Sequence, residues 1–535
     1  MRFIAIAILV SCLTFGCRTT NISQNHKQPR LIVVLSFDQY RGDYVTRFAS
    51  ITGDKGFKRM QNEGAWYSHC YFGHAVTQTG PGHATLLTGC YAAKHGIVAN
   101  NFCNAVDDEC FYCATDAKGQ ASAWLMTKPT VGEVLKTTSP ESKVVAVTIK
   151  DRAAVLMAGN TADAVVFTNN TSGNWETSTH YPTPRWLDDV SEKYSLANYR
   201  GQVWQTVLAD SIAALDAAPW EGSLSDGSKT FPHHISTNDS MAVADAMLTP
   251  FSLEALFNVC MTSLHAEQLG RDSTPDMLLI GASTTDLVGH VFGPDSREVQ
   301  ELYVHADSFV ERLIDTLDNN IGRDNYVLFV TSDHGVTPVP EYTRHQKNPG
   351  QPSIDAGRIH SKDMKALLEK ELTQQYGKPP NNWVSHIYAP HVYLSSEAIA
   401  WANVSPDTVA QKAAEIIRTV KGVGLAFSTS ALRQGECPPG ADEALCNLLK
   451  NDLHPDHAGQ VIMYPKPFWI VGSKTTTHGS PWEYDRWVPL LILGRGFGFG
   501  EDTTPVEPVD IAATIARTLG LYLDNVDGEA LPKHP

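Results

Sequence analysis

The chain has 535 residues, enough for one large α/β domain with insertions or for two to three smaller domains. Its formal net charge of −16, without a long basic run, argues against a nucleic acid polymer as a partner, because phosphate backbones are bound by basic patches. Small phosphate substrates are not excluded, because a local metal or cationic site can override the overall field.

The N-terminus has the composition of an export signal. Arg2 precedes the apolar run Phe3–Val10, and a short segment ends at Cys17, so residues 1–17 are predicted to be a signal peptide. Leu13–Cys17 (LTFGC) resembles a bacterial lipoprotein cleavage box with Cys17 as the lipidated residue, although Thr14 and Phe15 depart from that pattern. Ordinary signal cleavage is the alternative. Either way we expect an exported bacterial protein, periplasmic or anchored to the outer membrane through Cys17.

The cysteines fit an exported protein. Two of the ten, Cys12 and Cys17, lie in the leader, and the even number that is left favours disulfides. Cys437 and Cys446 flank a short Pro-Pro-Gly loop and are expected to pair. The remaining cluster could bind zinc, but disulfides are preferred because it contains no histidine. Its members are Cys103, Cys110 and Cys113.

The first strong structural signal is a set of apolar runs typical of strands buried on both faces of a parallel sheet. They are Arg30–Phe37, Lys143–Ile149, Asp276–Gly281, Asn325–Thr331 and Val488–Gly494. Amphipathic helices are expected at Ser296–Leu317 and Pro508–Leu519. Residues 158–251 and 338–467 lack this pattern and are candidate insertions that form the walls of a substrate pocket.

The stretch from Ala75 to Asn101 is rich in glycine, proline and small residues. Thr77–Gly82 (TQTGPG) is predicted to be a tight turn, with a short helix over Ala84–Cys90. A hydroxyl group on such a turn lies at a helix N-terminus, where free backbone N–H groups favour an anion. Thr79 is therefore a candidate for contact with a phosphate or sulfate, although turn-forming residues alone also fit an ordinary loop.

Charged residues follow four of the predicted strands, at the edge where open α/β sheets bind ligands. They are Asp38, Lys150 with Arg152, Asp286, and Asp333 with His334. His290 lies four residues after Asp286, so both can face the same way on a helical turn, and His478 precedes the last strand. Singly these are ordinary helix caps or surface histidines. Together, three aspartates and three histidines match the ligands of a two-zinc site.

These motifs, in this order, resemble the alkaline phosphatase superfamily, and within it the phosphate-irrepressible bacterial alkaline phosphatases of the PafA type, which use a threonine nucleophile. The matching motifs are Asp38, T-G-P-G-H, H-G-I-x-x-N, K-D-R, D-x3-H, S-D-H-G and H-G. The resemblance runs from about Leu31 to the C-terminus. It implies an α/β three-layer sandwich with a largely parallel central sheet and inserted cap segments, so that residues 30–535 form one catalytic domain.

The resemblance also implies roles for single residues. Asp38, Thr79, Asp333 and His334 would bind one zinc ion, and Asp286, His290 and His478 the other. Thr79 would attack phosphorus and form a phosphothreonine. Asn100, the backbone N–H of Gly80, Lys150 and Arg152 would hold the phosphoryl oxygens.

A charge count favours small phosphate monoesters as substrates. Two zinc ions would balance three aspartates and a Thr79 alkoxide, so Lys150 and Arg152 would match a monoester dianion better than a diester monoanion. The alternatives are a phosphodiesterase or nucleotide pyrophosphatase of the same superfamily and a non-catalytic zinc-dependent binding protein. An arylsulfatase is disfavoured because its C/S-x-P-x-R motif is absent.

Overall fold

The structure, a computed structural model, describes residues 28–105, 108–346, 353–498 and 500–532. The predicted signal peptide and Cys17 lie outside these residues. Within them, no single helix is long and apolar enough to cross a membrane, and two consecutive helices meet the length and composition criteria only as a pair bent by 81°.

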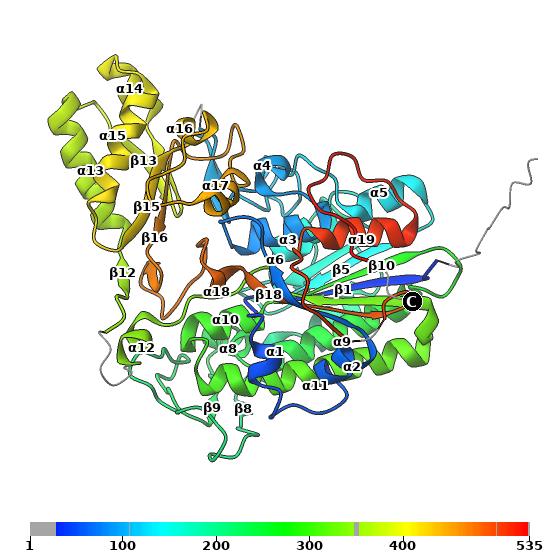
Figure 1. Ribbon diagram of the computed structural model, residues 1–535. Coiled ribbons are helices and arrows are strands. Elements are labelled where there is room, and N and C mark those ends of the chain that lie inside the picture. Colours follow the sequence, from blue (N-terminus) through cyan, green and yellow to red (C-terminus); the bar gives the residue numbers. More distant parts are fainter. Residues whose placement is uncertain (1–27, 106–107, 347–352, 499, 533–535) are drawn as a thin grey trace, which may run out of the picture.

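A nine-stranded sheet dominates the described part of the chain, in the order β19-β2-β18-β11-β1-β10-β5-β6-β7 (Figure 1). Its strands are β1 (Leu31–Phe37), β2 (Ala65–Tyr71), β5 (Val144–Thr148), β6 (Ala164–Thr168), β7 (Trp175–Glu176), β10 (Asp276–Ala282), β11 (Tyr326–Thr331), β18 (Trp487–Gly494) and β19 (Gly500–Asp502). The five strands from β11 to β6 are mutually parallel, whereas β18 runs antiparallel to both of its neighbours. The predicted, largely parallel sheet is confirmed.

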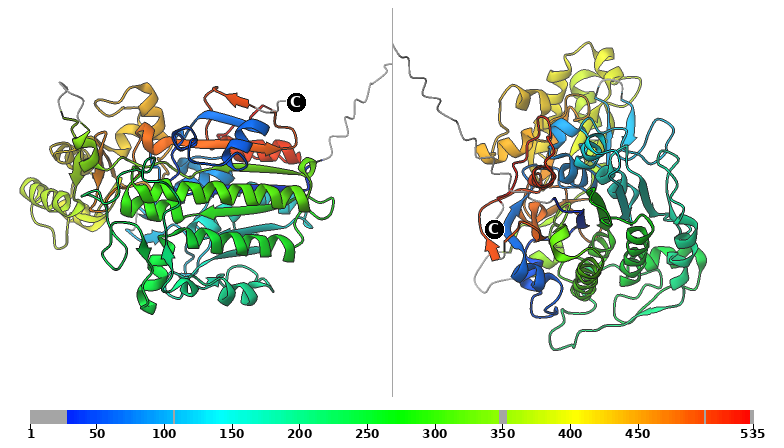
Figure 2. Two further views of the ribbon diagram at one scale, coloured as in Figure 1. Left: turned by 90° about the horizontal axis from the view of Figure 1, so that it is seen from below. Right: turned by 90° about the vertical axis from the view of Figure 1, so that its right-hand side faces the viewer.

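Helices cover both faces of the sheet, because alternate residues of the buried strands point to opposite sides. Leu31, Val33 and Leu35 of β1 belong to the core of one face, and Ile32 and Val34 to the core of the other. Figures 1 and 2 show the resulting three layers. The first face carries α2 (Phe57–Glu63), α7 (Leu187–Lys193), α8 (Asp239–Met247), α9 (Pro250–Ala266), α10 (Thr284–Phe292) and α11 (Arg297–Asn320); the second carries α3 (Thr79–Thr88), α5 (Val131–Thr138), α6 (Asp151–Ala158) and α19 (Asp510–Leu519).

A smaller lobe is built from the second candidate insertion, residues 338–467 (Figure 1). Its antiparallel sheet has the order β13-β14-β16-β15 and a hydrophobic core of its own. The main elements of the lobe are α13 (Ser361–Tyr376), β13 (Val384–Tyr388), β14 (His391–Leu394), α14 (Ser396–Ala402), α15 (Pro406–Arg418), β15 (Val423–Ser428) and β16 (Val461–Pro465). A short parallel pair, β12 (Gly357–Ile359) with β17 (Trp469–Val471), lies where the chain enters and leaves the lobe.

The first candidate insertion, residues 158–251, is partly a component of the main sheet. It supplies β6, which pairs in parallel with β5, and β7 at the sheet edge.

The remaining helices and strands of the described chain are short. They are α1 (Tyr44–Arg47), α4 (Ala92–His95), β3 (Asn101–Cys103), β4 (Cys110–Tyr112), η1 (Leu196–Tyr199), β8 (Val203–Trp204), β9 (His233–His234), η2 (Arg323–Asn325), α12 (Pro340–His345), α16 (Thr429–Arg433), α17 (Glu443–Lys450) and α18 (Glu483–Arg486).

The predicted turn over Thr77–Gly82 is wrong from Thr79 onward, because α3 already begins at Thr79. Pro81 lies in the first turn of this helix, where proline is tolerated because its missing N–H would have no intrahelical partner. Thr79 nevertheless lies at a helix N-terminus, as expected.

Two disulfides are formed among the described cysteines. Cys437 pairs with Cys446, as predicted, and Cys103 pairs with Cys110. The expectation of disulfides fails for the other four cysteines, which are buried free thiols; one of them is Cys113, the third member of the predicted cluster. Three of the four belong to the hydrophobic cores and pack there as small apolar residues, namely Cys70, Cys113 and Cys260.

Candidate active site

Four neighbouring strands deliver charged side chains to one edge of the sheet. The order β11-β1-β10-β5 places the carboxyl ends of these parallel strands side by side. The residues that follow them are Asp333, Asp38, Asp286 and Lys150. All four side chains are buried, and they meet at the crevice where open α/β sheets bind ligands.

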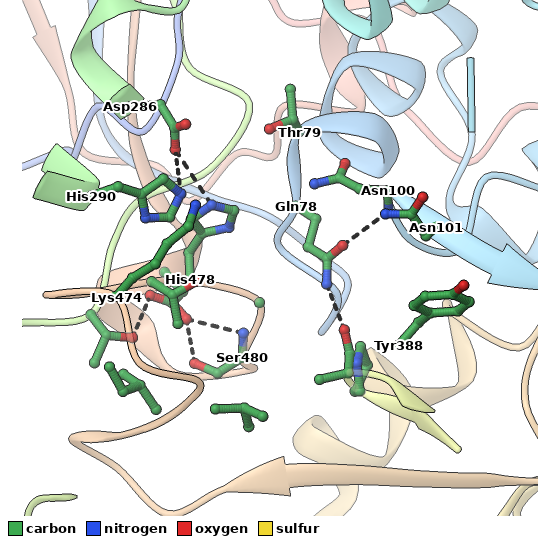
Figure 3. A pocket seen from close by; sticks show the side chains of 18 of the residues that line it. Gln78, Thr79, Asn100, Asn101, Asp286, His290, Tyr388, Lys474, His478 and Ser480 are labelled. Atoms are coloured by element: carbon green, nitrogen blue, oxygen red, sulfur yellow. Dashed lines mark hydrogen bonds and ion pairs between the residues drawn. The ribbon is translucent and has the colours of Figure 1, made fainter. Parts of the chain in front are cut away.

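Asp286 and two histidines form one candidate metal site. Asp286 and His290 face the same way on α10, and Asp286 Oδ1 lies 3.2 Å from His290 Nε2 and 3.4 Å from His478 Nε2 (Figure 3). The donor atoms of the three residues all lie within 4.8 Å of one another. Gln39 Nε2 also donates to Asp286 Oδ1, at 2.7 Å, and holds that carboxylate in place.

A second group lies beside the first. His334 Nε2 is 3.4 Å from Asp38 Oδ1 and 3.3 Å from Asp333 Oδ2. All three atoms are buried and find no hydrogen-bond partner among the described residues. Buried polar atoms are nearly always satisfied, so three unpartnered donors and acceptors that face one another fit a cation held between them.

The three histidines are oriented by the backbone. His290 Nδ1 lies 2.9 Å from the Thr476 carbonyl oxygen, and His334 Nδ1 lies 2.9 Å from that of Gly335. His478 Nδ1 lies 2.7 Å from the carbonyl oxygen of Thr77. Each ring therefore carries its proton on Nδ1 and presents the lone pair of Nε2 to the cluster, as a metal ligand requires.

Burial prepares the imidazoles for metal binding. It lowers the pKa of His290 to about 4 and holds the pKa of His334 well below its ordinary value, so both rings are neutral at neutral pH. Burial also raises the pKa of Asp333, helped by the neighbouring charge of Asp38. The carboxylates thus repel one another, and a cation between them would relieve that repulsion.

Thr79 lies next to this cluster and is itself buried. Arg152, on the first turn of α6, donates from one terminal nitrogen to Thr79 Oγ1 over 3.4 Å. Gly82, one turn further along α3, is in close contact with the Asp333 backbone, because a Cβ there would lie 2.2 Å from the Asp333 carbonyl oxygen. The glycine therefore allows Thr79 and the Asp333–His334 pair to come together.

Asn100 and Gly80 are joined to each other. Asn100 Oδ1 accepts a hydrogen bond of 2.7 Å from the Gly80 backbone N–H, and the Asn100 backbone N–H donates to Gln78 Oε1 at 3.0 Å. The resemblance implies that the Gly80 N–H helps Asn100 to hold a phosphoryl oxygen, and this role stays a prediction. In the structure this N–H orients Asn100, whose amide N–H groups remain for a ligand.

Lys150 lies between the two groups of candidate metal ligands, with its ammonium group 2.6 Å from Asp38 Oδ2 and 2.5 Å from Asp286 Oδ2. Although burial acts in the opposite direction, Lys150 thereby holds the pKa of Asp38 below its ordinary value. The role that the resemblance implies for it, binding a phosphoryl oxygen, stays a prediction.

Three further residues support the site and are missed by sequence reasoning. His83 is part of the T-G-P-G-H motif, and its Nδ1 lies 2.9 Å from the Thr79 carbonyl oxygen and 3.4 Å from Asp333 Oδ2. Gln39 directly follows Asp38. Tyr112 carries no local signal, yet its hydroxyl donates to Asp151 Oδ1 at 2.6 Å and accepts from Arg152.

These groups open into a pocket of about 470 Å³ that both lobes line (Figure 3). The main sheet supplies the polar end, including Thr79, Asn100 and Arg152. The smaller lobe and β17 supply an apolar wall with Tyr388 and Trp469. A buried hydroxyl group, a guanidinium and two groups of candidate metal ligands at the edge of such a sheet fit one class of protein, the hydrolases of the alkaline phosphatase superfamily.

Comparison with known proteins gives the family. Residues 32–482 match the type I phosphodiesterase / nucleotide pyrophosphatase family. The chain is 29% identical to alkaline phosphatase PafA of Elizabethkingia meningoseptica over 96% of this chain and 95% of that protein, and 30% identical to alkaline phosphatase PhoV of Synechococcus elongatus over 93% and 91%. The crystal structure of PafA superposes with a TM-score of 0.87, covering 94% of this chain and 98% of that one at 28% identity. The chain belongs to this family and, within it, to the PafA-like alkaline phosphatases.

Proposed function

We propose that this enzyme hydrolyses small phosphate monoesters through a covalent phosphothreonine on Thr79, with two zinc ions bound at the site. The observation that carries this proposal is the contact of the Arg152 guanidinium with Thr79 Oγ1. A cation at that position attracts the extra negative charge of a monoester dianion directly to the nucleophile.

The donor sets fit zinc. Asp38, Asp333 and His334 would hold one ion together with Thr79. Asp286, His290 and His478 would hold the other. Neutral imidazole and carboxylate are the nitrogen and oxygen ligands that zinc accepts. When bound, such ions supply Lewis-acid charge that favours the alkoxide of a nearby hydroxyl group and stabilises a leaving oxygen.

The chain's own residues position the reaction. Thr79 Oγ1, after losing its proton, attacks phosphorus, and the bond from phosphorus to the ester oxygen breaks. That oxygen leaves with its electron pair and takes up a proton from water, so that the alcohol is released. The Asn100 amide, oriented by Gly80, and the Arg152 guanidinium donate to the phosphoryl oxygens. Water then cleaves the phosphothreonine and releases inorganic phosphate. Because the transition state of phosphoryl transfer is loose, positioning and charge account for most of the rate enhancement.

The decisive experiment compares kcat/KM for an aryl phosphate monoester and the matching diester, with zinc-loaded protein. We expect a large preference for the monoester. Arg152→Ala should reduce monoester hydrolysis by at least about tenfold and diester hydrolysis much less. Arg271→Ala, which removes an exposed arginine bonded to the Asn320 carbonyl oxygen, is the matched control.

The family description favours a second candidate function, that of a phosphodiesterase or nucleotide pyrophosphatase on the same scaffold. A preference for the diester that is unchanged by Arg152→Ala would establish this function instead. If neither ester is hydrolysed and Thr79→Ala leaves zinc binding unchanged, the non-catalytic binding protein is the correct interpretation.

We also propose that the protein is exported and anchored by a lipid on Cys17. The two disulfides support an oxidising compartment. Expression in a bacterium should place the protein in the membrane fraction, and Cys17→Ser should move it to the soluble periplasmic fraction. If the unmodified protein and the Cys17→Ser variant are both soluble, the signal peptide is removed by ordinary cleavage without lipidation.

A further inference from the structure

Lys474 is a cationic side chain of the pocket for which the reaction described above has no use. It lies on the loop between β17 and His478, and its side chain extends past His290 and His478 toward Asp286 (Figure 3). It is exposed at the pocket, and among the described residues its ammonium group has no hydrogen-bond partner and no ion pair within salt-bridge distance. The charged groups that act on it include Asp286, Lys150 and Arg152.

The backbone of this loop is held from behind. Arg358, on β12, donates to the carbonyl oxygens of Lys474 and, at 2.9 Å, of Thr475. The same guanidinium is bound by both carboxylate oxygens of Glu341, at 3.0 Å and 2.6 Å. Lys474 therefore extends into the pocket from a fixed backbone position.

Its position corresponds to the leaving group. Thr79 and Asn100 lie on one side of the pocket in Figure 3, and Asp286, His290 and His478 on the other. In-line attack by Thr79 places the leaving oxygen on the side away from the nucleophile, which is the side of Lys474. Among the described residues that line the pocket, the other carboxylate besides Asp286 is Asp485, whose oxygens are occupied by Thr337 and Ser480.

We propose that Lys474 binds a second phosphate group on the leaving group, so that the preferred substrates are organic diphosphates from which the terminal phosphate is removed. This inference rests on the proposed monoesterase function and names its substrate class. Thr79 Oγ1 bonds to the terminal phosphorus, and the bond from that phosphorus to the bridging oxygen breaks. The bridging oxygen leaves with its electron pair as part of the second phosphate, whose charge Lys474 neutralises.

The apolar wall suits the rest of such a substrate. The pocket that Lys474 enters is also lined by Tyr388, Met463, Pro465, Trp469 and Ile470, all from the smaller lobe or from β17. An organic group attached to the second phosphate would lie against this surface, where aromatic and apolar side chains bind ring systems.

The test compares adenosine 5′-diphosphate, followed by initial formation of the monophosphate, with phenyl phosphate. Lys474→Met should lower kcat/KM for the diphosphate by about tenfold or more, the size of one charge-assisted hydrogen bond, and change that for phenyl phosphate by less than about twofold. Lys474→Arg should retain most of the diphosphate activity. Lys412→Met, which removes an exposed lysine paired with Glu415 on α15, is the matched control.

The results distinguish the role of Lys474 from the proposed monoesterase function. Equal losses for both substrates, or no loss for the diphosphate, would overturn the role of Lys474 while phenyl phosphate hydrolysis still supports the monoesterase. Failure of the unmodified enzyme to hydrolyse phenyl phosphate would overturn the proposed function itself. Zinc content and Tm are measured for every variant, and Lys474→Gln replaces the methionine variant if that one unfolds.

Discussion

The hydroxyl group of Tyr112 connects Arg152, the proposed phosphate-binding arginine, to Asp151. Tyr112 OH donates to Asp151 and accepts from Arg152, and Tyr112 belongs to neither group of candidate metal ligands. Tyr112 is therefore a positioning residue. Its hydroxyl group accepts a hydrogen bond from one terminal nitrogen of Arg152, which would otherwise turn toward Asp151. The other terminal nitrogen therefore stays directed at Thr79.

Replacing this hydroxyl group gives a specific test. Tyr112→Phe should lower kcat/KM for an aryl phosphate monoester by about three- to tenfold, the value of one hydrogen bond to a charged group, and weaken inhibition by inorganic phosphate in parallel. Diester hydrolysis should change little, because it depends less on Arg152. A purely structural effect of the substitution would reduce both substrates equally.

A second residue determines how stability depends on pH. Glu221 is buried, and burial, with the charge of Glu298 as the next cause, raises its pKa to about 8. In the unfolded chain this carboxyl group ionises near pH 4.5. The folded state therefore holds a proton that the unfolded state has lost, and folding stability decreases as the pH rises through about 5 to 8.

Glu221→Gln removes this titration. The free energy of unfolding of the unmodified protein, measured with urea, should fall between about pH 5 and pH 8, and that of the variant should fall less. Parallel pH profiles for the two proteins would show that Glu221 is ionised in the folded state as well.

At the scale of elements, one hairpin connects a disulfide to the active site. Strands β3 and β4 pair Cys103 with Cys110 and Asn101 with Tyr112, and Asn100 immediately precedes the hairpin. The disulfide thus closes one end of a short ribbon whose other end carries Asn100 and Tyr112.

This arrangement predicts that the two disulfides differ in function. Replacing Cys103 and Cys110 by serine should cost about 2–3 kcal/mol of stability and also reduce monoester kcat by several fold. Replacing Cys437 and Cys446, which close a loop of similar length away from the pocket, should cost similar stability but leave kcat unchanged. Equal kcat in both double variants would contradict the coupling. Denaturant unfolding and steady-state kinetics measure the two quantities.

Sequence patterns predict the central strands well and the edges poorly. The apolar runs around Leu31–Phe37 and Tyr326–Thr331 are long and β-branched, so their ends are right to within a residue. The strand β6 has only five residues and lies beside a polar segment. The sequence pattern therefore assigns it to an insertion and not to the main sheet. The run over Val488–Gly494 predicts a strand, but a run of apolar residues does not encode direction, and this strand is antiparallel.

The candidate metal ligands could be predicted because each lies next to a strand end or in a short motif. Tyr112 and Lys474 could not, because their approach to the site depends on a hairpin and on a loop held by Arg358 of another strand. The contact between Asn100 and Gly80 was likewise not predictable, since sequence gives no distance between two turns twenty residues apart.

For the molecule as a whole, metal binding and folding are expected to be coupled. Three buried carboxylates and three imidazoles converge on one site, with Lys150 as the internal cation beside two of the carboxylates. Zinc that binds only the folded state at a thousand times its Kd should add about 4 kcal/mol of stability.

Removal of the metal should therefore lower Tm as well as abolish hydrolysis. A chelator is expected to reduce both, and added zinc to restore both. The Asp286→Ala, His290→Ala double variant should show a smaller shift of Tm on chelation, because one donor set is lost. An unchanged Tm after verified metal removal would show that the cluster is stable without an ion.

The Nδ1 atoms of the three histidines of the cluster are hydrogen-bonded to backbone carbonyl oxygens. A carboxylate or amide that holds an imidazole can be lost through one codon change, whereas every residue that can occupy positions 77, 335 and 476 brings a carbonyl group with it. The backbone conformation, and not the identity of these three residues, therefore determines the tautomers of the imidazoles. The descendants of this enzyme can vary the side chains around the centre, and so its choice of substrate, while the geometry of the histidines is preserved.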